Sequence, residues 1–166
     1  STLTPFFNTN RMVMEYTQKF YIKANDRRKL IMANNMEKGL EFSKWKQYIT
    51  ANWPKVKFNN YTAESDGTGL KIGTSHVINA EVYLGDLKPE DIEVQVYFGK
   101  VDDIDKADSN SFKVMDCIPD SNNDGTYKYS GKIKCETTGR FGWTLRILPK
   151  HSLLINSFEL GLIKWA

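Results

Sequence analysis

The sequence has few of the residues from which catalytic centres and disulfide scaffolds are built. Its 166 residues include two cysteines, Cys117 and Cys135, and two histidines, His76 and His151. Two thiols do not make a disulfide framework in a chain of this length, and their spacing fits no zinc motif. We therefore expect both cysteines to be reduced and to lie on strands.

Long apolar runs and targeting segments are also missing. No stretch approaches the roughly 20 apolar residues that a membrane-spanning helix needs, and no signal-peptide pattern is visible. The sequon Asn60-Tyr61-Thr62 is a three-residue motif of the kind that recurs by chance. The sequence thus predicts a cytoplasmic protein without a membrane partner. Because it begins with Ser1 and not with methionine, we also expect it to be a piece of a longer polypeptide.

The charge is small but unevenly distributed. The net charge of +3 is too weak to predict a nucleic-acid partner. Residues 1–54 hold nine Lys or Arg against four Asp or Glu, whereas residues 55–166 hold fourteen against sixteen. This shift predicts two parts that join near Pro54: a helical segment over residues 1–54 and a β domain over residues 55–166.

Residues 9 to 53 follow a helical period. Thr9 or Asn10 is expected to cap a first helix, Ala24-Asn25-Asp26 to separate it from a second, and Pro54 to end the second helix. Large apolar side chains mark one face of each helix: Met12, Val13, Tyr16, Phe20, Leu30, Met32, Met36 and Leu40. Phe42, Trp45, Ile49 and Trp53 continue this face at spacings of three and four. Two helices cannot bury such a face alone. It is expected to pack either on the β part of this chain or on another domain.

From Val56 onward the period changes to two, and Gly, Pro, Asn and Asp clusters separate short apolar segments. We expect a mostly β fold, an immunoglobulin-like antiparallel β-sandwich of about seven strands preceded by two α-helices. The expected strands are Val56–Glu64, Ser75–Leu84, Asp91–Phe98, Ser111–Ile118, Thr126–Cys135, Arg140–Leu148 and Ser157–Ile163.

Two acidic segments are similar to cation sites, but loops explain both better. The segment from Asp120 to Gly125 matches the first half of an EF-hand loop, yet Gly131 stands where that loop needs a bidentate glutamate. We expect a hairpin turn in which Asp124 and Gly125 have positive φ. A second cluster is expected to be a solvated loop that protects a sheet edge: Asp102, Asp103, Asp105 and Asp108.

No pattern predicts a catalytic, cofactor-binding or metal-binding residue. His76 and His151 have no neighbour that would orient or activate them, so we expect them at the surface or at a sheet edge. The turn glycines Gly67, Gly69 and Gly139 do not form a phosphate-binding loop between a strand and a helix. A sugar-stacking platform remains open as an alternative to core packing for four aromatic residues: Tyr127, Tyr129, Trp143 and Trp165.

The segment FNTNRMVMEYTQKFYIKA, which starts at Phe7, resembles the end of the catalytic region in α-glucan phosphorylases, the glycogen, starch and maltodextrin phosphorylase family. Lys23 stands where that family usually has proline. The residues that match are Phe7, Asn10, Arg11, Met12, Val13, Glu15, Tyr16, Tyr21 and Ala24. The segment LEFSKWKQYITANWPKV resembles a later helix of the family. Three further segments resemble the all-β extension of the shorter bacterial and archaeal members: AEVYLGDLKPEDIEVQVYFG, MDCIPDSNNDGTYKYSGKIKCETTGRFGWTLRILPKH and ELGLIKWA.

The resemblance implies a non-catalytic C-terminal fragment of a glycosyltransferase. The intact relatives bind pyridoxal phosphate through a lysine and phosphorolyse terminal α-1,4-glucan links to glucose 1-phosphate. No position here matches their cofactor or substrate motifs, so the fragment is expected to hold no cofactor and to be no enzyme by itself. Its expected partners are the catalytic domains of the same chain and, secondarily, α-glucan.

Two other functions remain open. A free-standing carbohydrate-binding module of immunoglobulin-like type would expose coplanar aromatic rings on one face of the sandwich. An adhesion or signalling module would need a secretory context, which the sequence does not show.

Overall fold

A computed structural model describes residues 9–64, 75–100, 111–119, 124–134 and 141–166. The predicted segments that include Asp102 to Asp108, Asp120 to Asn123, Gly67 to Gly69 and Gly139 therefore lie outside the described residues, as does Cys135. The chain divides into two compact units between Tyr48 and Ile49. The sequence places the domain boundary at Pro54 instead, and this division stays a prediction.

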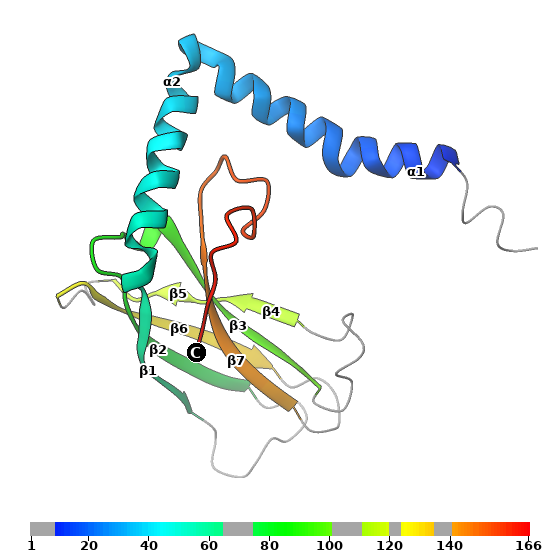
Figure 1. Cartoon of the computed structure of the whole chain (residues 1–166). Helices are drawn as coiled ribbons and strands as arrows, with labels where there is room; N and C mark the ends of the chain where they lie inside the picture. The colour runs from blue at the N-terminus through cyan, green and yellow to red at the C-terminus, as the bar shows by residue number, and fades with distance from the viewer. Residues whose placement is uncertain (1–8, 65–74, 101–110, 120–123, 135–140) are drawn as a thin grey trace, which may run out of the picture. The chain divides into compact units, whose positions relative to one another are not determined.

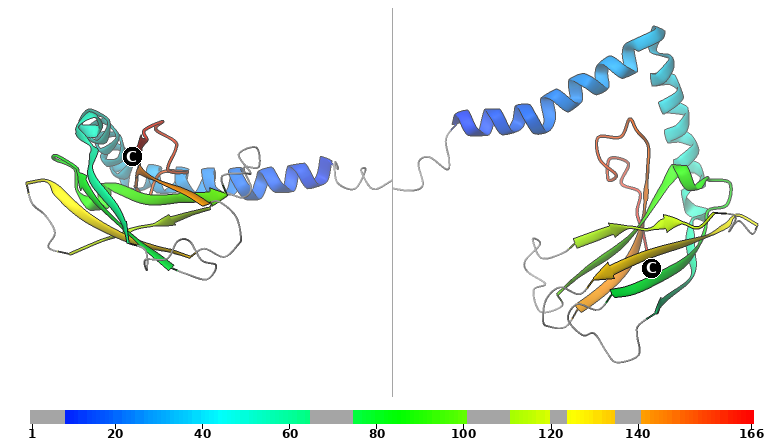
Figure 2. Two further views of the ribbon diagram at one scale, coloured as in Figure 1. Left: turned by 90° about the horizontal axis from the view of Figure 1, so that it is seen from below. Right: turned by 180° about the vertical axis from the view of Figure 1, so that it is seen from behind.

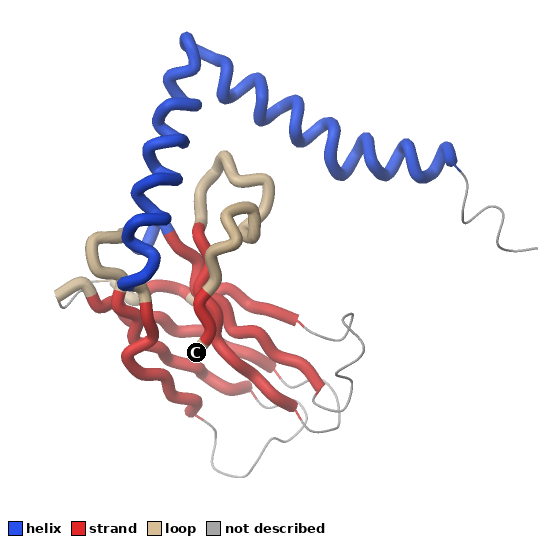
Figure 3. The backbone as a smooth tube through the Cα atoms, viewed as in Figure 1, coloured by secondary structure: helices blue, strands red, loops and turns tan. Residues whose placement is uncertain are grey.

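The first unit is helical (Figure 3). Helix α1 spans Thr9–Tyr16, a π-helical turn η1 spans Thr17–Tyr21, and helix α2 spans Ile22–Asn52 and so continues into the second unit. The predicted first helix is present, but its cap at Thr9 or Asn10 stays a prediction, because the described residues begin at Thr9. The predicted break at Ala24 to Asp26 is wrong, because the chain is helical through these residues.

Helix α2 contains one residue with an unusual backbone conformation, Met36. The φ angle of Met36 is 64°, in the left-handed region that non-glycine residues seldom occupy. Beyond this point a Cβ on Gly39 would lie 2.9 Å from Cγ2 of Ile31, so the absence of a side chain permits a close approach. The guanidinium of Arg27 lies 5.3 Å from the centre of the Phe42 ring.

The second unit is an antiparallel β-sandwich, and the predicted fold class is confirmed (Figure 1). After the 3-10 turn η2, Trp53–Lys55, the strands are β1 Lys57–Glu64, β2 Ser75–Tyr83, β3 Ile92–Lys100, β4 Ser111–Val114, β5 Asp116–Cys117, β6 Thr126–Lys134, β7 Phe141–Pro149 and β8 Lys164–Trp165. A second 3-10 turn, η3, spans Pro89–Asp91. Sheet A has the order β1-β2-β6-β5 and sheet B the order β4-β3-β7-β8. Figure 2 shows this sandwich from two further directions.

The core lies between the inner faces of the two sheets. Ile78, Ala80 and Val82 alternate along β2 with more exposed neighbours. Val94 and Val96 are buried on β3, where Gln95 between them is buried as well. The alternation along β2 is the reason why a period of two in the sequence predicts this strand. Further buried apolar residues belong to the same unit: Ile49, Trp53, Val56, Leu84, Leu87, Leu145, Ile147, Leu148 and Leu153.

Two strand predictions differ from the structure. The predicted strand Ser111–Ile118 is divided at Met115, so that β4 belongs to sheet B and β5 to sheet A. The predicted strand Ser157–Ile163 is wrong, because most of these residues form turns and the strand follows at Lys164–Trp165. Asn156 causes the turn: its side-chain oxygen accepts a hydrogen bond from the N–H of Phe158 (2.9 Å), and its carbonyl accepts one from Glu159 (3.2 Å).

Candidate functional site

The register of sheet B gathers one polar and aromatic set of side chains on its outer face. Gln95 on β3 lies opposite Val114 on one side and Arg146 on the other, and Arg146 lies opposite Trp165. Tyr97, two residues after Gln95, lies opposite Phe112. Because directly opposed residues of antiparallel strands share a face, these side chains all point away from the core.

The loop between β7 and β8 adds one more ring to this face. It leaves the sheet after Pro149 and returns at Lys164, and Figure 3 draws it in tan. Within it, Phe158 is placed by the turn at Asn156 and by a hydrogen bond from the N–H of Gly161 to the carbonyl of Phe158 (2.9 Å). The N–H of Ala166 then bonds to the carbonyl of Leu145 (3.0 Å) and holds the returning strand on β7.

Arg146 lies at the centre of four aromatic rings. Its guanidinium carbon is 4.9 Å from the ring centre of Tyr97, 5.4 Å from those of Phe112 and Phe158, and 5.7 Å from that of Trp165. All four distances are within the roughly 6 Å at which a cation is attracted by an aromatic ring. We call this group, Arg146 with Tyr97, Phe112, Phe158 and Trp165, the Arg146 cluster.

A polar chain balances the buried charge of Arg146. The Nε of Arg146 donates a hydrogen bond to Oε1 of Gln95 (2.7 Å), and Nε2 of Gln95 donates one to Oε1 of Glu93. Burial lowers the pKa of the Arg146 guanidinium, while Tyr97 and Glu93 act in the opposite direction. The guanidinium remains charged at neutral pH, so the cluster contains one cation with one carboxylate nearby.

The rings of the cluster are much more exposed than the cation they surround. Arg146 is 8% exposed, whereas Phe112 is 56%, Phe158 54% and Trp165 50% exposed. Each ring therefore turns part of its surface to the guanidinium and another part to solvent. Exposed aromatic groups of this kind mark interaction surfaces more often than isolated apolar residues do.

The outer face of sheet A carries a shallow polar groove of about 290 Å³. It is lined by Asn60, Tyr61, Thr62, Asn79, Ala80, Glu81, Ile118 and Lys128. Nζ of Lys128 lies 3.6 Å from Oε1 of Glu81, and both side chains are about half exposed. The two charged side chains of the groove, Lys128 and Glu81, are thus paired with each other at the surface.

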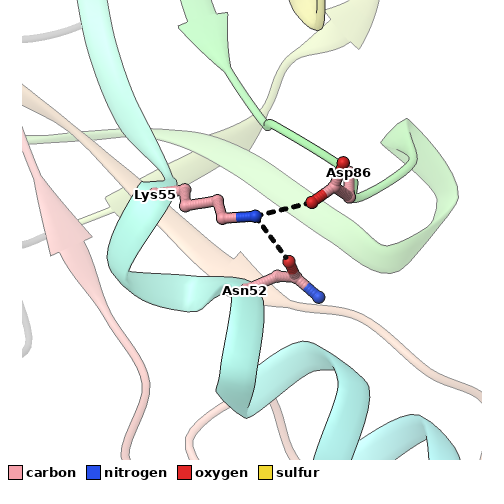
Figure 4. A network of polar contacts seen from close by, with 3 residues as sticks. All are labelled: Asn52, Lys55 and Asp86. Atoms are coloured by element: carbon pink, nitrogen blue, oxygen red, sulfur yellow. Dashed lines mark hydrogen bonds and ion pairs between the residues drawn. The ribbon is translucent and has the colours of Figure 1, made fainter.

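The start of the sandwich unit is fixed by a small polar network (Figure 4). Nζ of Lys55, in η2, lies 2.6 Å from Oδ2 of Asp86 and donates a second hydrogen bond to Oδ1 of Asn52 (3.4 Å). Gly85 permits this approach, since a Cβ there would lie 3.3 Å from Cδ of Lys55. The network joins the end of α2 to the turn after β2 and has a structural role.

Apolar side chains along the helices divide into two sets. Ile49 and Trp53 are buried members of the sandwich unit, at 0% and 5% exposed. Many residues before them are about half exposed or more: Met12, Val13, Met14, Tyr16, Tyr21, Ile22, Leu30, Met32, Met36 and Leu40. Helix α1 contains no buried residue. The predicted apolar stripe is therefore covered at its C-terminal end and exposed along α1 and much of α2.

The histidines have different environments. His76 lies on β2 and is 5% exposed, so its predicted place at a surface or edge is wrong. Position 76 is in phase with Ile78 and Ala80, and the alternation of the strand turns it inward. His151 is half-buried, and its Nδ1 accepts a hydrogen bond from the N–H of Leu153 (3.1 Å). Burial lowers the pKa of His151, and Asp91 partly offsets this effect.

The predicted hairpin turn is confirmed at its described end. Asp124 and Gly125 have φ angles of 50° and 80°. Among the described residues, no three His, Cys, Asp or Glu side chains gather closely enough to hold a metal ion. Within the same residues, no helix is both long and apolar enough to cross a membrane. Cys117 lies on β5 with a free thiol.

The four aromatic residues considered as a platform do not come together. Tyr127 and Tyr129 belong to sheet A, and Tyr129 is buried in the core. Trp143 meets the Tyr61 ring edge-on at 6.1 Å, and only Trp165 belongs to the Arg146 cluster. Sequence reasoning missed the rest of this cluster. The signal for it was a charged residue, Arg146, between the apolar residues Leu145 and Ile147.

The fold is that of a β-sandwich domain preceded by a helical segment. Residues 53–166 match the family of the glycogen phosphorylase C-terminal domain. The chain belongs to this family.

Curated relatives are similar over nearly the whole chain. Maltodextrin phosphorylase of Thermococcus litoralis is 32% identical over 172 residues, and glycogen phosphorylase of Mycobacterium bovis is 29% identical over 170 residues. Each comparison covers 99% of this chain but only 19% of the relative. The chain thus spans about a fifth of the length of these proteins.

One solved structure has a weak likeness to the fold. It is the carbohydrate-binding module of the muscle glycogen-targeting subunit of protein phosphatase-1, with a TM-score of 0.34 and 13% identity. The match covers 61% of this chain and 66% of that one. At this level the likeness supports no inference about function.

Proposed function

We propose that the chain is the non-catalytic C-terminal part of an α-glucan phosphorylase that acts in the cytoplasm. The intact enzyme would phosphorolyse α-1,4-glucan to glucose 1-phosphate with the help of pyridoxal phosphate. The helical segment would pack on the catalytic domains of the same polypeptide, and the sandwich would be an accessory module for stability, assembly or glucan contact. The family of residues 53–166 and the share of the relatives that the chain covers support this proposal.

The groove of sheet A does not fit pyridoxal phosphate. A site for this cofactor needs a lysine in a cleft, together with groups that bind a phosphate. The groove of sheet A contains Lys128, but this side chain is 57% exposed and pairs with Glu81. We assign the cofactor, and the reaction that depends on it, to the part of the polypeptide that this chain does not cover.

The single observation that carries the packing proposal is the exposed apolar surface of the helices. Met12 and Val13 on α1 are 54% and 53% exposed, and Leu40 on α2 is 62% exposed. Burial of a side chain of this kind contributes about 1.5–3 kcal/mol. A protein domain that covered these residues would therefore gain several kcal/mol, and the four-fifths of the relatives' length outside this chain supply the candidate.

Two experiments test the proposal. The purified 166-residue chain, given maltoheptaose and phosphate, is expected to release no glucose 1-phosphate. The reading frame upstream of Ser1 is expected to encode a catalytic region with a cofactor lysine. Phosphorolysis by the chain alone, or an upstream frame without such a region, would overturn the assignment.

Packing by the helices is tested in the intact polypeptide. The double substitution Met12→Asp and Val13→Asp is expected to lower both Tm and phosphorolytic activity, because it places two charges in an apolar contact. Ile118→Asp is the matched control, since Ile118 is an apolar residue of the sandwich and is 41% exposed. If the double variant and the control lose equal amounts of Tm and activity, packing through α1 is contradicted.

A free-standing carbohydrate-binding module is the second candidate. The observation in its favour is the group of half-exposed rings in the Arg146 cluster. A short upstream reading frame without catalytic region, combined with glucan binding by the chain, would favour it over the first proposal.

A further inference from the structure

We propose that the Arg146 cluster is a binding surface for α-1,4-glucan, with the rings of Phe112, Phe158 and Trp165 as the contacts for glucosyl units. The inference rests on the proposed function, because the phosphorylase assignment supplies the class of ligand. The geometry and the charge of the cluster indicate where on the domain this ligand would bind.

The rings are held in position before any ligand arrives. Phe112 and Trp165 lie on strands, and the turn at Asn156 fixes the backbone of Phe158. On their inner side all three contact one guanidinium at 5.4–5.7 Å, and the ring of Trp165 also meets the ring of Tyr97 edge-on at 5.8 Å. Side chains fixed in this way lose little conformational entropy when a ligand binds.

The charge of the cluster favours a neutral ligand. Arg146 is the cation, and its Nε is bonded to Gln95, which is bonded in turn to Glu93. The guanidinium is thus surrounded by four rings, and its hydrogen bond to Gln95 connects it to the carboxylate of Glu93. A phosphate or an anionic membrane would find little unbalanced positive charge here, whereas a neutral ligand meets no electrostatic penalty.

The exposed surface fits a ligand with both apolar and polar faces. A glucosyl unit has a face of C–H groups that can lie on an aromatic ring, and hydroxyl groups around its rim that remain in water. Half-exposed rings allow both at once, because one part of each ring is available and its surroundings are wet. Three such rings around one centre can contact successive units of a chain of sugars.

The test uses the 166-residue chain labelled with 5-fluorotryptophan. Its four tryptophans, Trp45, Trp53, Trp143 and Trp165, give one ¹⁹F signal each, and single Trp→Phe substitutions assign them. Titration with maltoheptaose is expected to shift the Trp165 signal, with a dissociation constant in the millimolar range or below, and to leave the buried Trp53 unchanged. The β-1,4-linked cellohexaose is expected to have no effect.

Variants test the other rings. Phe112→Leu and Phe158→Leu keep apolar volume on Arg146 but remove the ring, and each is expected to weaken maltoheptaose binding about tenfold. Tyr21→Leu is the matched control, because Tyr21 is an aromatic residue on the helical segment and is 66% exposed. Its binding is expected to equal that of the unchanged chain.

Several results would overturn the inference. A silent Trp165 signal, a shift confined to Trp143, or an equal response to cellohexaose would each exclude a specific glucan surface at the cluster. A Trp165 signal that moves only on addition of the catalytic part would show a protein contact instead. The proposed function is tested separately, by the upstream reading frame and by the phosphorolysis assay. Failure of the glucan-binding inference is therefore distinguishable from failure of the proposed function.

Discussion

Arg146 and Trp165 are register partners on β7 and β8, and the guanidinium of Arg146 lies 5.7 Å from the centre of the Trp165 ring. Strand β8 has only two residues, so few backbone hydrogen bonds fix it. The contact between cation and ring therefore contributes to the attachment of the C-terminal segment. The same contact gives Trp165 its place in the Arg146 cluster.

Replacement of Arg146 by lysine tests this role. Lysine keeps the charge but lacks the planar group that contacts four rings and the Nε that bonds to Gln95. We expect Arg146→Lys to lower the free energy of unfolding by about 1–3 kcal/mol, measured by urea denaturation. Lys128→Met, which removes only an exposed ion pair with Glu81, should cost less than about 1 kcal/mol. Similar values for the two variants would argue against the contribution of the rings.

Gly131 is expected to tolerate no side chain. A Cβ at this position of β6 would lie 2.9 Å from Cγ of the buried Met115, between the two sheets. We expect Gly131→Ala to lower the free energy of unfolding by about 1–3 kcal/mol through overpacking. Met115→Ala in the same chain should recover part of the Gly131→Ala loss, because it makes the space that the new methyl group needs. Strict additivity of the two changes would speak against a contact.

Substitution of Gly125 is expected to be unfavourable for a different reason. Its φ of 80° is in a region unfavourable for L-residues, and a Cβ would lie 3.0 Å from the carbonyl oxygen of Gly85. Gly125→Ala should therefore destabilise the sandwich by about 1–2 kcal/mol. Asp124→Gly should be nearly neutral or stabilising, since φ at that position is also positive. Thermal unfolding measures the Tm of both variants, and an equal loss of Tm in both would contradict these expectations.

His151 makes the stability depend on pH. Its pKa is lowered in the folded state by burial, so the folded protein binds fewer protons than the unfolded chain as the pH falls below the ordinary value of 6.5. The free energy of unfolding should be highest above about pH 7 and should decrease through the range just below 6.5. Protonation of Nδ1 also removes the acceptor for the N–H of Leu153.

The variant His151→Gln isolates this effect. Glutamine does not titrate, so the slope of stability against pH between about pH 7.5 and about pH 5.5 should be smaller in His151→Gln than in the unchanged chain. Urea denaturation at several pH values gives both slopes. A variant with an unchanged slope would assign the pH dependence to other groups.

Much of the fold was predictable because local chemistry determines it. The alternation in Ile92 to Phe98 gives β3, and Asp124-Gly125 gives the turn before β6, since both depend on near neighbours. The positive φ of Met36 was not predictable in this way. It occurs together with a close approach of Gly39 to Ile31, and no propensity of methionine indicates either feature.

The candidate site was less predictable than the fold. Trp165 was considered for sugar contact, but its neighbours Tyr97, Phe112 and Phe158 come from two strands and one loop that are distant in sequence. Only strand order and register bring them to one cation. His76 shows the same limit, because its inward direction follows from the phase of β2 and not from the residue type.

Met115 is the one residue between β4 in sheet B and β5 in sheet A. Because a single residue connects the two strands, a displacement of β4 at the edge of sheet B must also displace β5 at the edge of sheet A. We expect amide hydrogen exchange in β4 and β5 to rise and fall together, as in a single cooperative unit. The sandwich should accordingly lose both layers in one event when it is unfolded by force or by denaturant.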